Sequence, residues 1–132
     1  MTRLFNIRHD ERGAAAIEMA IAVPILALFL WGIFQIGIAF QASAGMQHAL
    51  GEGARYATIF PAPTNDQIKT RINDKKFGVG VGTFSAPTVT DAADGTYKDM
   101  SVTFSMPMNF LFFNGPTVNL TRSKRVYIYQ NT

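Results

Sequence analysis

The chain has 132 residues, which is the size of one small unit rather than of two soluble domains. It contains no cysteine, and this excludes a disulfide framework and thiolate chemistry. The formal net charge is +3, and the charges after residue 40 are scattered rather than gathered in one block, which indicates a solvated surface.

Residues 1–13 form a short basic leader. It carries three arginines against two acids: Arg3, Arg8 and Arg12 against Asp10 and Glu11. Since Lys and Arg in short flanks tend to stay on the cytoplasmic side of a membrane, we expect a cytoplasmic N-terminus and an exported C-terminal part. Because that part is exported, nucleic acid is not expected as a partner.

Residues 14–40 are almost wholly apolar and predict a transmembrane helix. As a helix they would extend about 40 Å, which exceeds the hydrocarbon thickness of about 30 Å. The lone acid Glu18 stands near the start of this segment, although a charge at the centre of a membrane helix costs roughly 2.5–3.5 kcal/mol, and less near its ends. An anchor alone would do better with leucine there, so we expect the carboxylate to have a function.

Three residues inside this segment affect how the helix bends or packs. Pro24 removes one backbone hydrogen bond, which predicts a kink or a locally loosened turn. Gly32 and Gly37 offer small surfaces suited to close helix packing, although their spacing is not that of Gly-x-x-x-Gly. The general frequency of glycine in membrane helices explains these two residues equally well.

Residues 41–60 predict an amphipathic extension of the same helix. Small and apolar residues recur at the spacing of one helical face: Met46, Ala49, Leu50, Gly53, Ala54 and Ala57. The whole helix is expected from about Ala14 to about Thr58, before two prolines that end it. Three glycines weaken the extension, so a break near residue 45 or 51 is an open alternative.

Residues 61–132 predict a small extracytoplasmic head, so the fold class is α+β. Thr64 begins a short helix with Gln67 at the capping-box distance, and Gly78 is expected to end it. Three or four antiparallel strands should pack on a helix. Strands are expected within 77–90, 101–106 and 118–129, turns at 91–95 and 114–116, and inward side chains at Val102, Phe104 and Met106.

Residue types that often form sites have ordinary explanations here. The two histidines, His9 and His48, are expected on opposite sides of the membrane, which excludes a shared metal and a conventional catalytic triad. The glycine-rich segment 78–82 lacks the spacing of a phosphate-binding loop. Asp91, Asp94 and Asp99 either hold a weak Ca²⁺ or simply form turns. We expect no catalytic residue, no metal and no cofactor, and therefore no enzyme.

A run of aromatic residues, Phe110, Phe112 and Phe113, precedes the last predicted strand. Such residues belong to a core or an interface more often than to a ligand site. If they are exposed, they indicate a partner surface.

The junction between the leader and the apolar segment resembles the processing site of type IV prepilins. Gly13 would precede the cut, and Glu18 would become the fifth residue of the mature chain. The wider segment RGAAAIEMAIAVPILALFLWGIFQIG and the later LGEGARYATIF are similar to the TadE-like pseudopilins of tight-adherence (Flp) pilus systems. The resemblance covers residues 12–60.

This resemblance implies a pilin-like fold and a minor pilin-like subunit that supports assembly of an adhesive Flp-type pilus. A prepilin peptidase would cleave after Gly13 and leave a free ammonium on Ala14, which Glu18 of a neighbouring subunit could pair. The implied partners are the membrane, the peptidase, other pilins or pseudopilins and the inner-membrane assembly platform. The implied location is the bacterial inner membrane, crossed once.

A second interpretation remains open, in which signal peptidase cuts after Ala44 and releases a soluble binding module. Ala42-Ser43-Ala44 fits the small-x-small pattern that precedes such a cut. A conventional signal peptide has an apolar region of about 7–15 residues. The apolar segment here is longer, and its acid lies at the cytoplasmic end.

Overall fold

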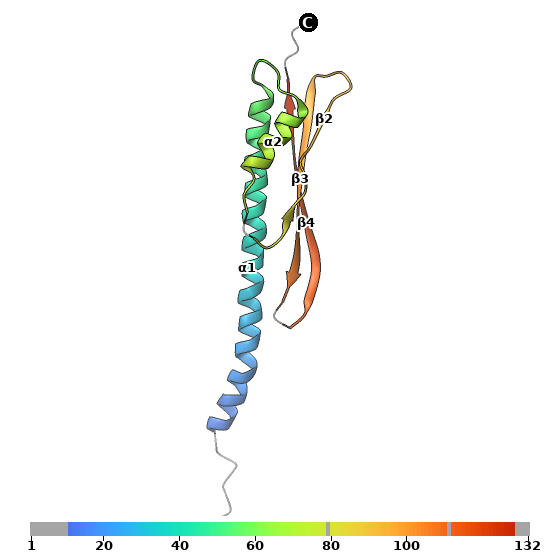
Figure 1. The fold of residues 1–132 in the computed structure, drawn as a ribbon. Coiled ribbons are helices and arrows are strands. Elements are labelled where there is room, and N and C mark those ends of the chain that lie inside the picture. Colours follow the sequence, from blue (N-terminus) through green and yellow to red (C-terminus); the bar gives the residue numbers. More distant parts are fainter. Residues whose placement is uncertain (1–10, 79, 111, 129–132) are drawn as a thin grey trace, which may run out of the picture.

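A single helix forms the spine of the protein. The computed structural model describes residues 11–78, 80–110 and 112–128, so most of the predicted leader, with His9, lies outside the described residues. Helix α1 (Glu11–Ala57) is 47 residues long and runs the length of the molecule (Figure 1). It continues through Pro24, Gly45 and Gly51, so the break considered near residue 45 or 51 does not occur.

Two glycines of α1 stand where the head packs most closely on the helix. A Cβ on Gly45 would overlap the carbonyl oxygen of Phe77, and one on Gly53 would overlap the side chain of Ile72. Glycine lowers helix propensity by about 1 kcal/mol relative to alanine, but it permits this close approach. Packing, rather than a helix break, therefore explains both residues.

Helix α2 (Asn65–Lys75) begins with the predicted capping box. The Thr64 hydroxyl accepts a hydrogen bond from the Gln67 amide at 3.3 Å, and the Gln67 side chain accepts one from the Thr64 amide at 2.9 Å. Ile68 and Ile72 are fully buried on the side of α2 that faces the core. The start and the apolar face of this helix are thus confirmed.

The end of α2 differs from the prediction. The helix stops at Lys75, and Lys76 is already extended while its amide donates to the carbonyl oxygen of Ile72. The expectation that Gly78 ends the helix is therefore wrong. The physical reason is tertiary, because the chain leaves the helix early to bring the backbone of Phe77 against Gly45.

Four strands form one antiparallel sheet beside α1 (Figure 1): β1 (Thr83–Phe84), β2 (Thr88–Asp91), β3 (Tyr97–Asn109) and β4 (Asn114–Tyr127). Strand β4 pairs with β3 along nearly its whole length, whereas β1 and β2 share the other edge of β3. The α+β class with one antiparallel sheet is confirmed. Among the described residues of the segment 77–90, only β1 and the first three residues of β2 are strand.

The turn expected at 114–116 is wrong. Residues 114–116 already belong to β4, and the chain reverses between Asn109 and Asn114, which pair with each other. The amide of Phe110 donates to the carbonyl oxygen of Phe113 at 2.9 Å and closes this reversal. Pro116 is compatible with β4 because β4 is an edge strand, where a missing amide donor is tolerated.

The core lies between the helices and one face of the sheet. Alternate residues of β3 point into it, and each is 1% exposed: Met100, Val102, Phe104 and Met106. They meet the predicted apolar face of α1, which confirms both patterns. On the opposite face, polar pairs such as Thr103 and Thr121, whose hydroxyl oxygens lie 2.9 Å apart, meet water.

The glycine-rich segment before β1 also has a structural explanation. Gly82 has a φ of +120°, in a region that side chains rarely adopt. A Cβ at this position would in addition overlap the ring of Phe104. Residue 82 is therefore glycine because the chain must pass directly over a core side chain.

The three aspartates considered as a Ca²⁺ site, Asp91, Asp94 and Asp99, are engaged by side chains of the head itself. The Arg125 guanidinium donates two hydrogen bonds of 2.7 Å to Asp99 and holds the pKa of that carboxyl below its usual value. Hydrogen bonds from Lys98 and Asn65 likewise lower the pKa of Asp91. Asp94 accepts hydrogen bonds from Thr96. Within the described ranges, no group of three potential metal ligands converges.

Candidate membrane anchor and processing segment

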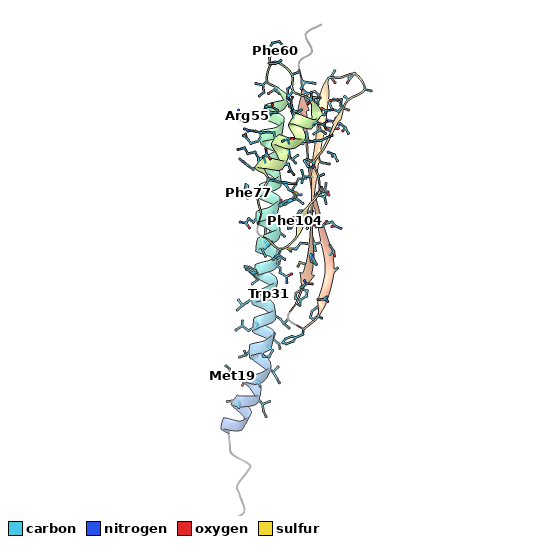
Figure 2. All side chains as sticks on the ribbon, in the orientation of Figure 1. Met19, Trp31, Arg55, Phe60, Phe77 and Phe104 are labelled. Carbon is cyan, nitrogen blue, oxygen red and sulfur yellow. The ribbon has the colours of Figure 1, made fainter. Side chains whose placement is uncertain are left out.

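The part of α1 before Trp31 exposes apolar side chains over most of its surface. Ile17 is 65% exposed and Phe29 is 64% exposed, and most of the large apolar residues between them are similarly open, whereas Leu28 is half-buried. Figure 2 shows this part of the helix, with Met19, extending beyond the sheet. Within the described part of the chain, α1 is the one helix long and apolar enough to cross a membrane. A water-soluble protein would bury such a surface.

The predicted processing residues lie in the first turns of α1. Gly13, Ala14 and Glu18 are all exposed. Because Ala14 and Glu18 are four residues apart in one helix, they lie on the same face, one turn from each other. No charged residue stands between Glu18 and Glu52, so this carboxylate is isolated at the start of the apolar surface.

The three predicted bending and packing residues have different surroundings. Pro24 lies inside the continuous α1. A Cβ on Gly37 would meet nothing within 4 Å, so its small surface is open to a neighbour. A Cβ on Gly32 would lie 4.0 Å from the ring of Phe110, so this glycine faces the protein's own head.

Sequence reasoning missed how far down α1 the head reaches. The Trp31 indole donates to the carbonyl oxygen of Asn109 at 2.6 Å. The Gln35 side-chain amide donates to the same oxygen at 2.9 Å and accepts from the Asn109 amide at 3.0 Å. Gln35 is 3% exposed. A signal was present, since Gln35 is the one amide or charged side chain between Glu18 and Gln41.

The head therefore begins to contact α1 inside the segment 14–40, although this whole segment was expected to be the transmembrane helix. Trp31 and Gln35 hold the β3–β4 turn, and Ile38 is buried with the core. Figure 2 shows Trp31 near the end of the hairpin that lies farthest from Phe60. Only the part of α1 before Trp31 extends free of the sheet.

Comparison with protein-family models finds a match in the N-terminal part of the chain. Residues 13–55 match the family model of the TadE-like proteins. No curated protein and no solved structure matches the chain. That family is structural rather than enzymatic, and the long apolar helix of the present chain fits a membrane span. Residues 13–55, which form nearly all of α1, are therefore similar to the TadE-like proteins.

Proposed function

We propose that the protein is a minor pilin-like subunit that supports assembly of an adhesive Flp-type pilus from the bacterial inner membrane. The observation that carries the proposal is the N-terminal half of α1. It is apolar and exposed over most of its surface, lies almost wholly within the segment that matches the TadE-like model, and carries Glu18 as its one charge after Gly13. A helix that only anchors the protein does not need that carboxylate, whereas in an assembling subunit the carboxylate can pair with a charge on a neighbouring subunit.

Processing after Gly13 is compatible with the start of α1. The bond between Gly13 and Ala14 lies near the N-terminal end of the described helix, and a Cβ on Gly13 would meet no atom of the head within 4 Å. A prepilin peptidase could therefore reach the backbone around Gly13 without displacing any part of the head. The cut creates an ammonium on Ala14.

The mature N-terminus then provides a means of assembly. Glu18 of one subunit accepts the Ala14 ammonium of its neighbour, and the exposed apolar surfaces of their helices pack side by side. A desolvated ion pair of this kind fixes register more than it adds stability. Gly37 and the neighbouring exposed surface of α1 are open to such packing. The second pseudopilin, the major pilin and the assembly platform are the proposed partners.

The alternative, release by signal peptidase after Ala44, finds less support. Ala42 and Ser43 are buried in the middle of α1, and the Ser43 hydroxyl accepts a hydrogen bond from Arg122 at 3.0 Å. A cut there would require opening a helix that is packed on the sheet. It would also remove Trp31 and Gln35, which hold the β3–β4 turn.

Replacing Gly13 by valine should abolish processing, because a side chain there obstructs a tight peptidase site. We expect mass spectrometry of wild-type protein from the native membrane to show Ala14 as the first residue. The Gly13→Val variant should remain a membrane-inserted precursor. Gly37→Val is the matched control, since a Cβ at that position meets no atom within 4 Å, and it should be processed normally. Gly45 as the first wild-type residue would support signal peptidase instead.

The proposed orientation places the head outside the cytoplasm. A phosphatase reporter that is active only after export should be active when fused after Thr132 and inactive when fused after Arg12. The reason is the basic leader, which favours a cytoplasmic N-terminus. An inactive Thr132 fusion, with the fused protein present at full length in the membrane fraction, would contradict the orientation and the assembly model built on it.

A further inference from the structure

We propose that the tip of the β3–β4 hairpin is a second membrane contact, which rests in the lipid interface on the extracytoplasmic side. The tip consists of Phe110, Phe112 and Phe113, next to Trp31 of α1. The partner is the lipid surface at the boundary between acyl chains and headgroups. This inference rests on the proposed membrane span of α1, but it concerns the head.

The tip is held rigidly at one level of α1. Both backbone polar groups of Asn109 are bonded to the side chain of Gln35, and the indole of Trp31 donates to the same carbonyl. The ring of Phe110 lies beside Gly32, and it stacks on Phe113 with 4.7 Å between the ring centroids. The hairpin end therefore cannot drift away from this part of the helix without breaking these contacts.

That level coincides with the expected edge of the bilayer. From Ala14, the first residue of the expected span, to Trp31 the helix rises about 26 Å, which is slightly less than the hydrocarbon thickness of about 30 Å. If the apolar segment were immersed farther, toward Phe40, the tip would lie deeper still. In either case the exposed rings of the tip meet lipid rather than bulk water.

The surface at this level suits a lipid interface. Phe112 is 73% exposed, Phe113 is 56% exposed and Trp31 is 40% exposed. Aromatic side chains concentrate at membrane–water boundaries, where their rings sit at the level of the headgroups. The exposed rings are continuous along the helix with Phe34, which is also exposed and contacts Trp31 at 5.6 Å between ring centroids.

The half of the β3–β4 hairpin that would contact lipid carries no charged residue. No charged residue lies between Asp99 and Arg122, so the half of the hairpin that carries the tip is uncharged. The ion pair of Asp99 with Arg125 lies toward the other end of the sheet. Around the turn, the amide of Phe110 and both backbone groups of Asn109 already have partners, which lowers the cost of leaving water.

The absence of cysteine from the sequence permits a direct measurement of depth. A nitroxide spin label is attached at Phe112→Cys in the full-length protein. Tyr127→Cys is the matched control, because Tyr127 is 70% exposed and lies at the opposite end of β4. Phe29→Cys marks the membrane span. The proteins are reconstituted, at a low protein-to-lipid ratio, in vesicles of phosphatidylcholine and phosphatidylglycerol.

We expect the label at residue 112 to collide with a water-soluble nickel chelate several-fold less often than the label at residue 127. It should also collide more often with oxygen, which concentrates in lipid. Equal chelate accessibility at 112 and 127, with the label at 29 shielded, would overturn the tip contact and leave the span intact. If the label at residue 29 were accessible to the chelate, the result would instead contradict the proposed membrane span of α1.

Shielding of the label at residue 112 could come from lipid or from a second copy of the chain, and lowering the protein-to-lipid ratio distinguishes the two. Shielding of residue 112 that persists when the protein-to-lipid ratio is lowered further supports the lipid contact. Shielding that disappears on this dilution would overturn it in favour of a second copy of the chain. Circular dichroism of each labelled variant checks that the fold is retained.

Discussion

Replacing Gly45 by alanine should destabilise the head, although alanine is the better helix former. The added methyl group would overlap the carbonyl oxygen of Phe77, which is backbone and cannot rotate away. Overpacking of a core costs typically about 1–3 kcal/mol, and sometimes more. The gain in helix propensity offsets only about 1 kcal/mol. Since the overlap is with backbone, we expect a net loss of about 2 kcal/mol in the free energy of unfolding.

Gly51→Ala is the matched control for this prediction. It lies on the same helix, and apart from the helix backbone around it, its Cβ would come no closer than 3.9 Å to any atom, the nearest being Nζ of Lys124. It should leave stability unchanged or raise it by up to about 1 kcal/mol. Both variants are measured by urea unfolding of the full chain in detergent micelles. The fluorescence of Trp31, the single tryptophan, reports undocking of the hairpin. A Gly45→Ala protein as stable as Gly51→Ala would show that the close approach at Phe77 is not maintained.

Replacing Glu18 by glutamine should abolish pilus formation while the protein still accumulates in the inner membrane. If Glu18 pairs with the Ala14 ammonium of a neighbour, glutamine removes the charge and nearly keeps the shape. An unpaired ammonium then remains in the contact, at a cost on the order of 3–5 kcal/mol if it is fully desolvated and less at the interface. Such a loss weakens a subunit contact without expelling the helix from the membrane.

If Glu18 instead paired with the Ala14 ammonium of its own chain, the Glu18→Gln substitution should have a much smaller effect on pilus formation. Ala14 and Glu18 lie on the same face of α1, so the mature N-terminus could also reach its own carboxylate. Pairs at this spacing stabilise a helix by only about 0.2–0.5 kcal/mol. Piliation and adherence at wild-type levels in the Glu18→Gln strain would therefore refute the pairing between subunits.

Two checks make the Glu18→Gln result specific. Mass spectrometry of the N-terminus shows whether the variant is still cleaved, which separates failed assembly from failed processing. Glu52→Gln is the control substitution, since Glu52 is the next acid along α1 and pairs with Arg55 and Arg71 of the same chain, at 3.1 and 3.2 Å. It should leave the pili, counted by electron microscopy, at wild-type numbers.

Local patterns in the sequence were sufficient for the elements whose causes are local. The apolar face of the helical extension, the capping box of Thr64 and Gln67 and the alternation around Phe104 depend on residues a few positions apart. The same holds for the junction of Gly13 and Glu18, whose family resemblance the comparison of residues 13–55 supports. Its role in processing and assembly stays a prediction.

Tertiary structure decided the features that join distant parts of the chain. The reversal at 110–113, rather than at 114–116, depends on the pairing of Asn109 with Asn114 and on the docking of Asn109 by Gln35. From the sequence, Gly45 was expected to weaken the helix. Its actual role is to make room for the backbone of Phe77, which comes near it only after folding. Propensity and spacing describe a residue's neighbours along the chain, whereas a close approach or a buried amide pair depends on which segments the packed core brings together.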